Sequence, residues 1–157
     1  ASDYGQLSFL DNNEGIDGEQ IKSLISELLV EDIIISSISL KDVIKFMSSY
    51  DEKLDKIWEM SDRFFDPSVA SYLLNPLNKN HDYDDIAATY LNITMMPSKE
   101  LFGKQSLQSA NQNKSDSMLK YACYRAFAAF SAVRPMREAL EGSGMIQLFE
   151  NIEYHQP

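Results

Sequence analysis

Residues 63–91 read RFFDPSVASYLLNPLNKNHDYDDIAATYL, and two helix starts in this stretch decide how the chain folds. Asp66 followed by Pro67 combines an N-capping side chain with a proline at the first helical position, so a helix is predicted to begin there. The helix should end at Asn75, because a residue before proline is driven out of the α region. It is expected to pack on the long helix near the C-terminus through one apolar face, formed by Val69, Tyr72 and Leu73.

The second helix start lies in an acidic cluster, HDYDD at residues 81–85, which allows two interpretations. Asp82 precedes an apolar helical pattern and is a natural N-cap, while Asp84 and Asp85 fall in the first turn, near the positive end of the helix dipole. Asp84 and Asp85 fit poorly as ligands of one metal ion, because the side chains of adjacent helix residues point about 100° apart. The calcium-loop pattern also fails, since no glycine or terminal glutamate follows at the required spacing. Capping is therefore favoured over a ligand role.

The composition indicates a single domain spanning residues 1–157, with enough apolar residues for a real core. The formal net charge of −10 repels phosphate backbones, so the chain alone should bind nucleic acid poorly. Cys123, the one cysteine, lies in an apolar run and is expected to be a buried, inert thiol in a reducing, cytoplasmic setting. No apolar run approaches the ~20 residues needed to cross a bilayer, so no membrane is expected as a partner.

The N-terminal third predicts alternating strands and helices. Residues 4–10, YGQLSFL, read as a strand followed by a turn. An amphipathic helix with Asp17 near its start follows, carrying Ile21, Leu24, Ile25, Leu28 and Leu29 on one face. Residues 32–38, DIIISSI, are β-branched and apolar on both sides, which predicts a buried strand. A second helix should run from Leu40 to about Met47.

The C-terminal half predicts mostly helix. Residues 92–114 look like a long connection, in which LFGK is expected to form a local turn and no phosphate site. From Asp116 a long alanine-rich helix should run to glycines 142 and 144, with an apolar stripe of Leu119, Cys123, Ala126, Phe127 and Phe130. A last helix should point Ile146, Phe149 and Ile152 inward. The prediction is an α/β fold: a small sheet surrounded by helices, helix-rich in its C-terminal half.

Taken in order, several motifs resemble one family. These are FDPSVASYLLNP, DYDDIAATYL, ELFGK, the alanine-rich helix and GMIQLFENIE. They are similar to the 3′–5′ exonuclease domain of bacterial DNA polymerase I, a family A polymerase. The order and spacing of the motifs carry the resemblance over nearly the whole chain. The C-terminus keeps Ile152 and Glu153 of the family pattern but departs from the proline-leucine that follows it.

The resemblance implies a ribonuclease H-like α/β fold, truncated at the N-terminus because nothing before Tyr4 supplies the family's first Asp-x-Glu strand. Active members hold two divalent metals such as magnesium with carboxylates from separate elements, because hard cations prefer oxygen ligands. The third acid of the family follows a lysine in a K-Y-D pattern. Here Lys41, Asp42 and Val43 match that pattern, so Val43 stands where the aspartate belongs, and Asp42 is one residue off.

The fourth family acid lies in a Y-x-x-x-D pattern on the long helix. Tyr121 matches its tyrosine, and Arg125 stands where the aspartate belongs. No Asp or Glu occurs between Ser117 and Arg137, so no shift of register restores the ligand. The degenerate site positions are therefore Val43, Tyr121 and Arg125. No catalytic residue, no metal ligand and no bound cofactor are expected.

The resemblance therefore implies a catalytically vestigial domain of a larger DNA polymerase I, which acts in DNA replication and repair. Its partners would be the polymerase domain of the same chain, and DNA only through the full-length protein, with the fragment itself monomeric. Two alternatives stay open. One is an active metal-dependent exonuclease that uses other acids, such as Asp66 with Asp84 or Asp85. The other is a free-standing helical interaction domain with an acidic surface.

Overall fold

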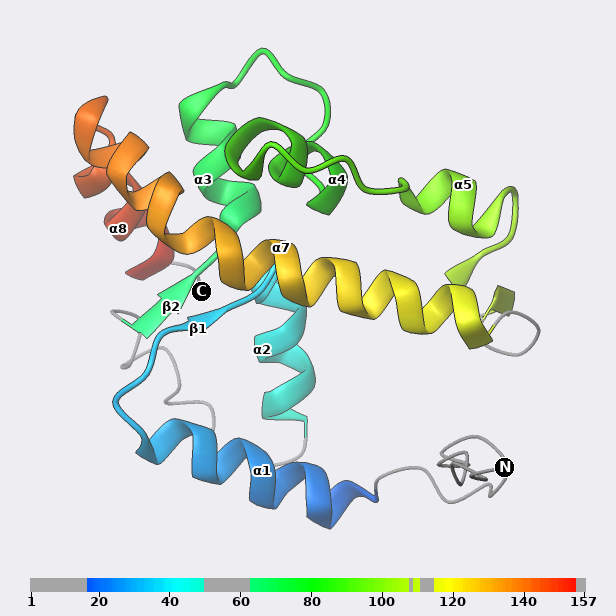
Figure 1. The fold of residues 1–157 in the computed structure, drawn as a ribbon. Coiled ribbons are helices and arrows are strands. Elements are labelled where there is room, and N and C mark those ends of the chain that lie inside the picture. The colour runs from blue at the N-terminus through cyan, green and yellow to red at the C-terminus, as the bar shows by residue number, and fades with distance from the viewer. Residues whose placement is uncertain (1–16, 50–62, 108, 111–114, 155–157) are drawn as a thin grey trace, which may run out of the picture.

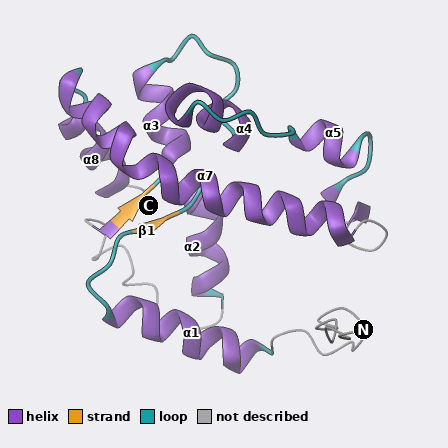
Figure 2. Cartoon of the chain, in the orientation of Figure 1, coloured by secondary structure: helices purple, strands orange, loops and turns teal. Residues whose placement is uncertain are grey.

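The computed structural model describes residues 17–49, 63–107, 109–110 and 115–154, and it is helix-rich with one small sheet (Figures 1 and 2). The elements follow in the order α1 (Gly18–Val30), β1 (Ile35–Ser36), α2 (Leu40–Ser48), β2 (Phe64–Phe65), α3 (Pro67–Leu74), α4 (Tyr83–Ile86), the π-helical η2 (Ala87–Leu91), α5 (Ser98–Phe102), α7 (Ser115–Gly142) and α8 (Ile146–Tyr154). The predicted α/β class with a helix-rich C-terminal half is confirmed. The predicted strand at residues 4–10 lies outside the described residues.

The sheet consists of β1 and β2, which pair in parallel with Ile35 opposite Phe64 and Ser36 opposite Phe65. Successive side chains of a strand point to opposite faces, so each strand contacts two different layers. Phe64 belongs to a core cluster with residues of α1 and α2, whereas Phe65 belongs to the main core with α7 and α8. Figure 1 shows this layering, with α7 on one side of the strands and α1 and α2 on the other.

The main core is built around the alanine-rich part of α7, against which α3, α4 and η2 pack. Its fully buried members include Phe65, Tyr83, Ile86 and Met136. The ring of Phe65 lies 4.9 Å from the ring of Phe149 in α8, which anchors the last helix to the sheet. Two of the three predicted inward positions of α8 are confirmed, since Phe149 is buried and Ile146 packs on the same core, whereas Ile152 is only half-buried.

The two predicted N-caps, Asp66 and Asp82, are present, and Asp17, expected only to lie near a helix start, is a third N-cap. The Asp17 carboxylate accepts from the Gln20 amide at 2.8 Å, and the Gln20 side chain accepts from the Asp17 amide in return, which completes a capping box at α1. Asp66 caps α3 with Pro67 at its first turn, and Asn75 ends that helix as predicted. Asp82 caps α4. These predictions hold because capping depends on a few adjacent residues.

The predicted buried strand at residues 32–38 is wrong in extent. Only Ile35 and Ser36 form a strand, and Ile33 and Ile34 are 42% and 51% exposed. Ile38 is buried in the main core, as the apolar run predicted. The strand is short because, among the described residues, only β2 pairs with it, so the flanking isoleucines have no strand beside them.

The predicted buried face of α7 is also wrong. Phe127 and Phe130 are 47% and 81% exposed, Leu119 and Ala126 are exposed, and the Cys123 thiol is exposed, so the expectation of a buried thiol fails. The helix instead buries Ala128, Ala129, Ala132, Met136 and Leu140. Small side chains let a helix axis approach its neighbours closely, so α7 packs against β1, α3 and α4 through its alanine face.

Two smaller predictions need correction. In α3, Tyr72 is 55% exposed, while Val69 and Leu73 pack against the core as expected. The helix does pack on α7 as predicted, but through Ala70 and its neighbours. The connection at residues 92–114 contains the short helix α5, and Gly103 of the LFGK motif ends it with φ of +65°. LFGK is thus a local helix end, which confirms the predicted turn.

Replacing the buried Asp66 with alanine should lower the free energy of unfolding by about 2–4 kcal/mol, because backbone amides of two helices lose their acceptor. The matched control is Asp17→Ala, which removes an exposed cap from one helix and should cost about 1 kcal/mol. Urea unfolding followed by circular dichroism measures both. Equal losses in the two variants would contradict the role given to Asp66.

Candidate functional site

The polar centre of the fold is the turn of residues 37–40, which connects β1 to α2 at the carboxyl end of the parallel strands. Ligand sites of open α/β sheets form at this end. Ser39 has φ of +59°, a left-handed conformation that is uncommon for a residue with a side chain. The Ser37 amide donates to the Phe65 carbonyl at 3.2 Å, so the turn is tied to β2 as well. The turn of residues 37–40 is therefore the candidate functional site.

Asp66 holds this turn from one side. Its side chain is buried, with the residue 5% exposed, and Oδ2 accepts from the Leu40 amide at 2.8 Å. Oδ1 accepts from the Ser68 amide at 2.8 Å and from the Ser68 hydroxyl. One carboxylate therefore caps α3 and the start of α2 together. Both of its oxygens point at backbone amides, near the positive ends of two helices.

Arg125 of α7 holds the same turn from the other side. Its Nη2 donates to the Ile38 carbonyl at 2.6 Å, and its Nη1 donates to the Tyr121 hydroxyl at 3.0 Å. The same Nη1 lies 3.5 Å from Oδ1 of Asp82, the N-cap of α4. The guanidinium also lies 5.4 Å from the centre of the Tyr121 ring, within cation–π range. Arg125 thus joins α7 to the turn and to α4.

Of the three positions that were predicted to be degenerate, namely Val43, Tyr121 and Arg125, only the last two lie together. Tyr121 and Arg125 contact each other one helical turn apart on α7. Val43 packs elsewhere, against the cluster of Leu29, Leu40, Ile44 and Phe64 between α1, α2 and β2. A valine is suited to that apolar contact, which gives a structural reason for the side chain it carries.

An aromatic group surrounds Tyr121. The rings of Tyr83 and Phe102 meet the Tyr121 ring edge-on at 5.7 and 5.3 Å, and Tyr124 lies 5.9 Å from Tyr83. The Tyr83 hydroxyl donates to the Met96 carbonyl at 2.6 Å. Burial, and secondarily the carboxylates of Asp84 and Asp82, raise the pKa of Tyr83 well above its ordinary value. Tyr83 therefore stays protonated and acts as a packed hydrogen-bond donor.

The acids of the HDYDD cluster are engaged locally. Asp84 accepts from the Asn80 side chain at 3.2 Å, and Asp85 accepts from the Asn78 side chain at 2.8 Å. The Nδ1 atom of His81 lies 2.9 Å from the hydroxyl of Ser71, which is itself buried. The asparagine contacts fasten the loop before α4 to the first turn of that helix, and the His81 contact joins the loop to α3. Within the described ranges, no group of three or more His, Cys, Asp or Glu side chains is placed to hold a metal ion.

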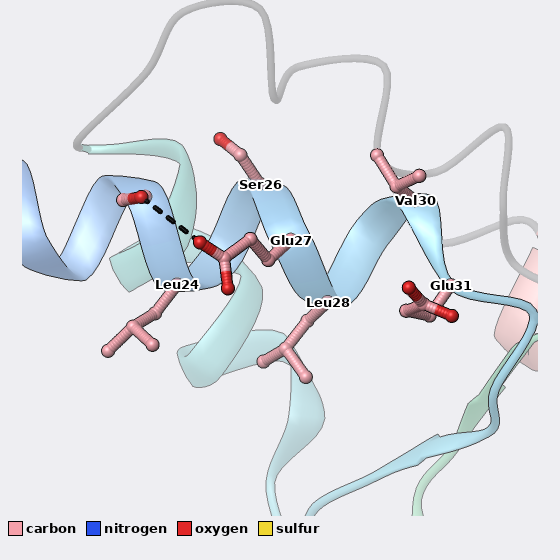
Figure 3. A pocket seen from close by; sticks show the side chains of 7 residues that line it. Leu24, Ser26, Glu27, Leu28, Val30 and Glu31 are labelled. Atoms are coloured by element: carbon pink, nitrogen blue, oxygen red, sulfur yellow. Dashed lines mark hydrogen bonds between the residues drawn. The ribbon is translucent and has the colours of Figure 1, made fainter.

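Two hollows lie away from this polar centre. One, of about 700 Å³, runs along α1 and is lined by Leu24, Leu28 and Val30 together with Ser26, Glu27 and Glu31 (Figure 3). Within this helix the Ser23 hydroxyl donates to the Glu27 carboxylate at 3.4 Å. The second, of about 340 Å³, lies beside β1 and α7. The lining of the second is almost entirely apolar, which suits packing, whereas serine and glutamate side chains share the lining of the first with leucine and valine.

No family model, no curated protein and no solved structure matches the chain. Of the helices in the described ranges, none is long and apolar enough to cross a membrane. The polar centre therefore provides the observations on which the functional proposal rests.

Sequence reasoning predicted Arg125 to stand at the position of a lost ligand, but it missed the contacts that the side chain makes. Its carbonyl partner, Ile38, is 87 residues away in the sequence, so no local pattern could reveal the contact. Asp66 was expected to cap α3, and its second bond, to the Leu40 amide 26 residues away, was missed for the same reason. An arginine within an alanine-rich helical stretch was the one available signal that a buried acceptor lay nearby.

Replacing Arg125 with methionine should destabilise the fold by about 1–3 kcal/mol, because the Ile38 carbonyl and Asp82 lose a charged donor. The matched control is Arg134→Met on the same helix, where an exposed pair with Glu138 is removed and less than about 0.5 kcal/mol should be lost. Chemical unfolding of both variants provides the measurement. Indistinguishable midpoints would show that Arg125 does not hold the turn.

Tyr83 should make stability fall at alkaline pH. Its folded pKa is raised, so its contribution is fully present below the unfolded pKa of about 10 and is lost as pH rises above that value. The difference in unfolding free energy between wild type and Tyr83→Phe should therefore be constant up to about pH 9.5. Above pH 10 it should shrink by as much as about 1.4 kcal/mol per pH unit. A difference that stays flat to pH 11 would contradict this.

Proposed function

We propose that the chain is a non-catalytic, exonuclease-like domain of a DNA polymerase I, with a ribonuclease H-like α/β fold. Its supports are the ordered set of sequence motifs and a parallel strand pair flanked by helices, with its polar centre at the carboxyl end of the strands. In this proposal the domain acts as a scaffold within a polymerase that serves DNA replication and repair. Its partner is the polymerase domain of the same chain, and it meets DNA only through the full-length protein.

The observation that carries the proposal is the position of the Arg125 guanidinium. It stands where the motif of the family has a metal-binding aspartate, and it is fixed there by the Ile38 carbonyl, Tyr121 and Asp82. Two-metal hydrolysis needs ions that position the attacking water and stabilise the leaving oxygen. A permanent positive charge at this point opposes a divalent cation instead of binding it.

The alternative of an active nuclease with other acids gains little support from the geometry. Asp66 turns both oxygens to backbone amides that start two helices, so metal binding would have to break those caps. Asp84 and Asp85 lie in the first turn of α4 and accept hydrogen bonds from Asn80 and Asn78 of the preceding loop. A scaffold role uses these same contacts without disturbing them.

The purified chain should leave a 3′-labelled single DNA strand intact, even with excess magnesium or manganese, because the polar centre offers a guanidinium where the chemistry needs a carboxylate. Val43→Asp should recover no activity, since one acid cannot rebuild a site for two ions. A time course against a chelator control gives the readout.

Two controls make this test decisive. Asp84→Ala and Asp85→Ala remove acids without touching the buried caps, so the fold should survive. Shortening of the strand that exceeds the chelator control and disappears in either variant would show a live enzyme. A reading frame that stops soon after Pro157, with no polymerase behind it, would instead favour a free-standing interaction domain.

A further inference from the structure

An apolar hollow of about 340 Å³ lies beside β1, and the proposed function does not use it. Its lining comes from α1, from the residues at β1 and from α7, namely Leu28, residues 33–36, Phe130 and Val133. The hydroxyl in this lining, that of Ser36, donates to the Ala129 carbonyl at 2.8 Å. The other lining side chains are apolar, and the volume falls within the ~300–1,000 Å³ that is typical of small-molecule sites. The hollow therefore suits the apolar part of a small ligand.

The large side chains at the hollow are exposed. Phe130 is 81% exposed, Ile34 is 51% exposed and Leu28 is 46% exposed. Covering such side chains is favourable, because apolar surface is removed from water. Single exposed apolar residues are ordinary, but a cluster from three segments of the chain around one hollow indicates a binding surface. The polar groups at its border then decide which ligand binds.

A partly buried arginine of α7 lacks an acceptor. The Arg137 guanidinium lies over the Phe65 ring, 5.4 Å from the ring centre, which is within cation–π range. Its Nε atom is buried and has no hydrogen-bond partner among the described residues. Buried donors nearly always have an acceptor, because an unsatisfied donor costs its full desolvation. The residue as a whole is only half-buried, so a rotation of its long side chain can bring the guanidinium to an acceptor at the surface.

Two independent relations place Arg137 beside the hollow. Along α7 it follows Val133 by four residues, so the two side chains lie on the same side of the helix, about 6 Å apart along its axis. Across the sheet, Phe65 pairs with Ser36, and neighbouring strands are about 4.8 Å apart. Val133 and Ser36 both line the hollow. Figure 1 shows α7 passing over the two strands. The guanidinium therefore stands at the border of the hollow that is nearer to β2.

The charges around Arg137 favour a ligand with a single carboxylate. The planar fork of a guanidinium matches the two oxygens of a carboxylate. Arg134 is already paired with Glu138 at 3.0 Å, and the exposed Glu141 lies one helical turn beyond Arg137. With these acids nearby and a net charge of −10, the site would repel a dianion such as a phosphate monoester.

We propose that the hollow and Arg137 form a binding site for a small amphipathic carboxylate, such as a medium-chain fatty acid. The apolar tail covers Phe130 and Ile34, and the carboxylate accepts from the Arg137 guanidinium. Binding turns Arg137 away from the Phe65 ring and gives its Nε atom the acceptor that it lacks. The site adds a ligand to a domain otherwise proposed as a scaffold, and it does not depend on the exonuclease-like assignment.

The direct test is isothermal titration calorimetry of the full chain in physiological salt, with decanoate as the probe. Decanol has the same tail without the charge and is the matched control, while butyrate supplies the carboxylate on a short tail. We expect decanoate to bind at least about tenfold more tightly than decanol, as a charge-assisted hydrogen bond would give, and butyrate to bind too weakly to measure. Equal affinities for decanoate and decanol, or no binding of decanoate, would overturn the proposal.

Two pairs of variants separate the contact with the carboxylate from the contact with the tail. Arg137→Met should abolish the preference for decanoate over decanol, whereas Arg134→Met removes the same charge nearby and should keep it. Phe130→Ser should weaken both ligands roughly fivefold or more, whereas Phe127→Ser, outside the hollow, should change either by less than about twofold. All four side chains are at least partly exposed, and circular dichroism checks that the helices persist. Equal effects within either pair would contradict the site.

Nuclear magnetic resonance of the wild-type chain locates the ligand without any substitution. Decanoate should shift the methyl signals of Ile34 and Val133, and the Nε–H signal of Arg137 should shift with the same midpoint. Leu24 provides an internal control, because it lines the hollow along α1. Larger shifts at Leu24 than at Ile34, or an Arg137 signal that does not respond, would show that decanoate binds elsewhere and would overturn the proposal.

Discussion

The turn of residues 37–40 is clamped from two sides, and the arrangement of the layers depends on this clamp. Asp66 accepts from the Leu40 amide while it caps α3, so the end of β2 fixes the start of α2. Arg125 donates to the Ile38 carbonyl from α7, so the long helix fixes the end of β1. The left-handed Ser39 between them is strained on its own and persists because its neighbours are held.

This clamp also explains why the polar centre is structural in character. A buried carboxylate is stable when its oxygens accept from amides, and a partly buried guanidinium is stable when it contacts a carbonyl and a carboxylate. Asp66 and Arg125 satisfy these needs through the backbone of the same turn and through Asp82. A site for hydrolysis would instead leave oxygens directed at a metal ion or a water. Asp66 and Arg125 here hold four elements together: α2, α3, α4 and α7.

How far the sequence predicts this fold depends on the range of each interaction. The caps at Asp66 and Asp82 were predicted correctly, because a cap and the local amide it serves are only one or two residues apart. The buried face of α7 was predicted wrongly, because apolar residues recur at helical spacing on two faces of this helix. The choice of the alanine face follows from how closely β1 and α3 approach, which periodicity does not encode. The motif could only single out position 125 as a site residue, whereas the contact of Arg125 with Ile38 could be seen only in the fold.

The central claim is that Arg125 occupies the polar centre in place of a metal ion, and manganese titration of the isotope-labelled chain tests it most directly. Paramagnetic broadening shows where Mn²⁺ resides. We expect only diffuse broadening over the acidic surface of this chain, whose net charge is −10, and we expect physiological salt to disperse it. The contradicting result is selective loss of the Ile38, Leu40 and Asp82 amide signals at substoichiometric manganese, persisting in salt.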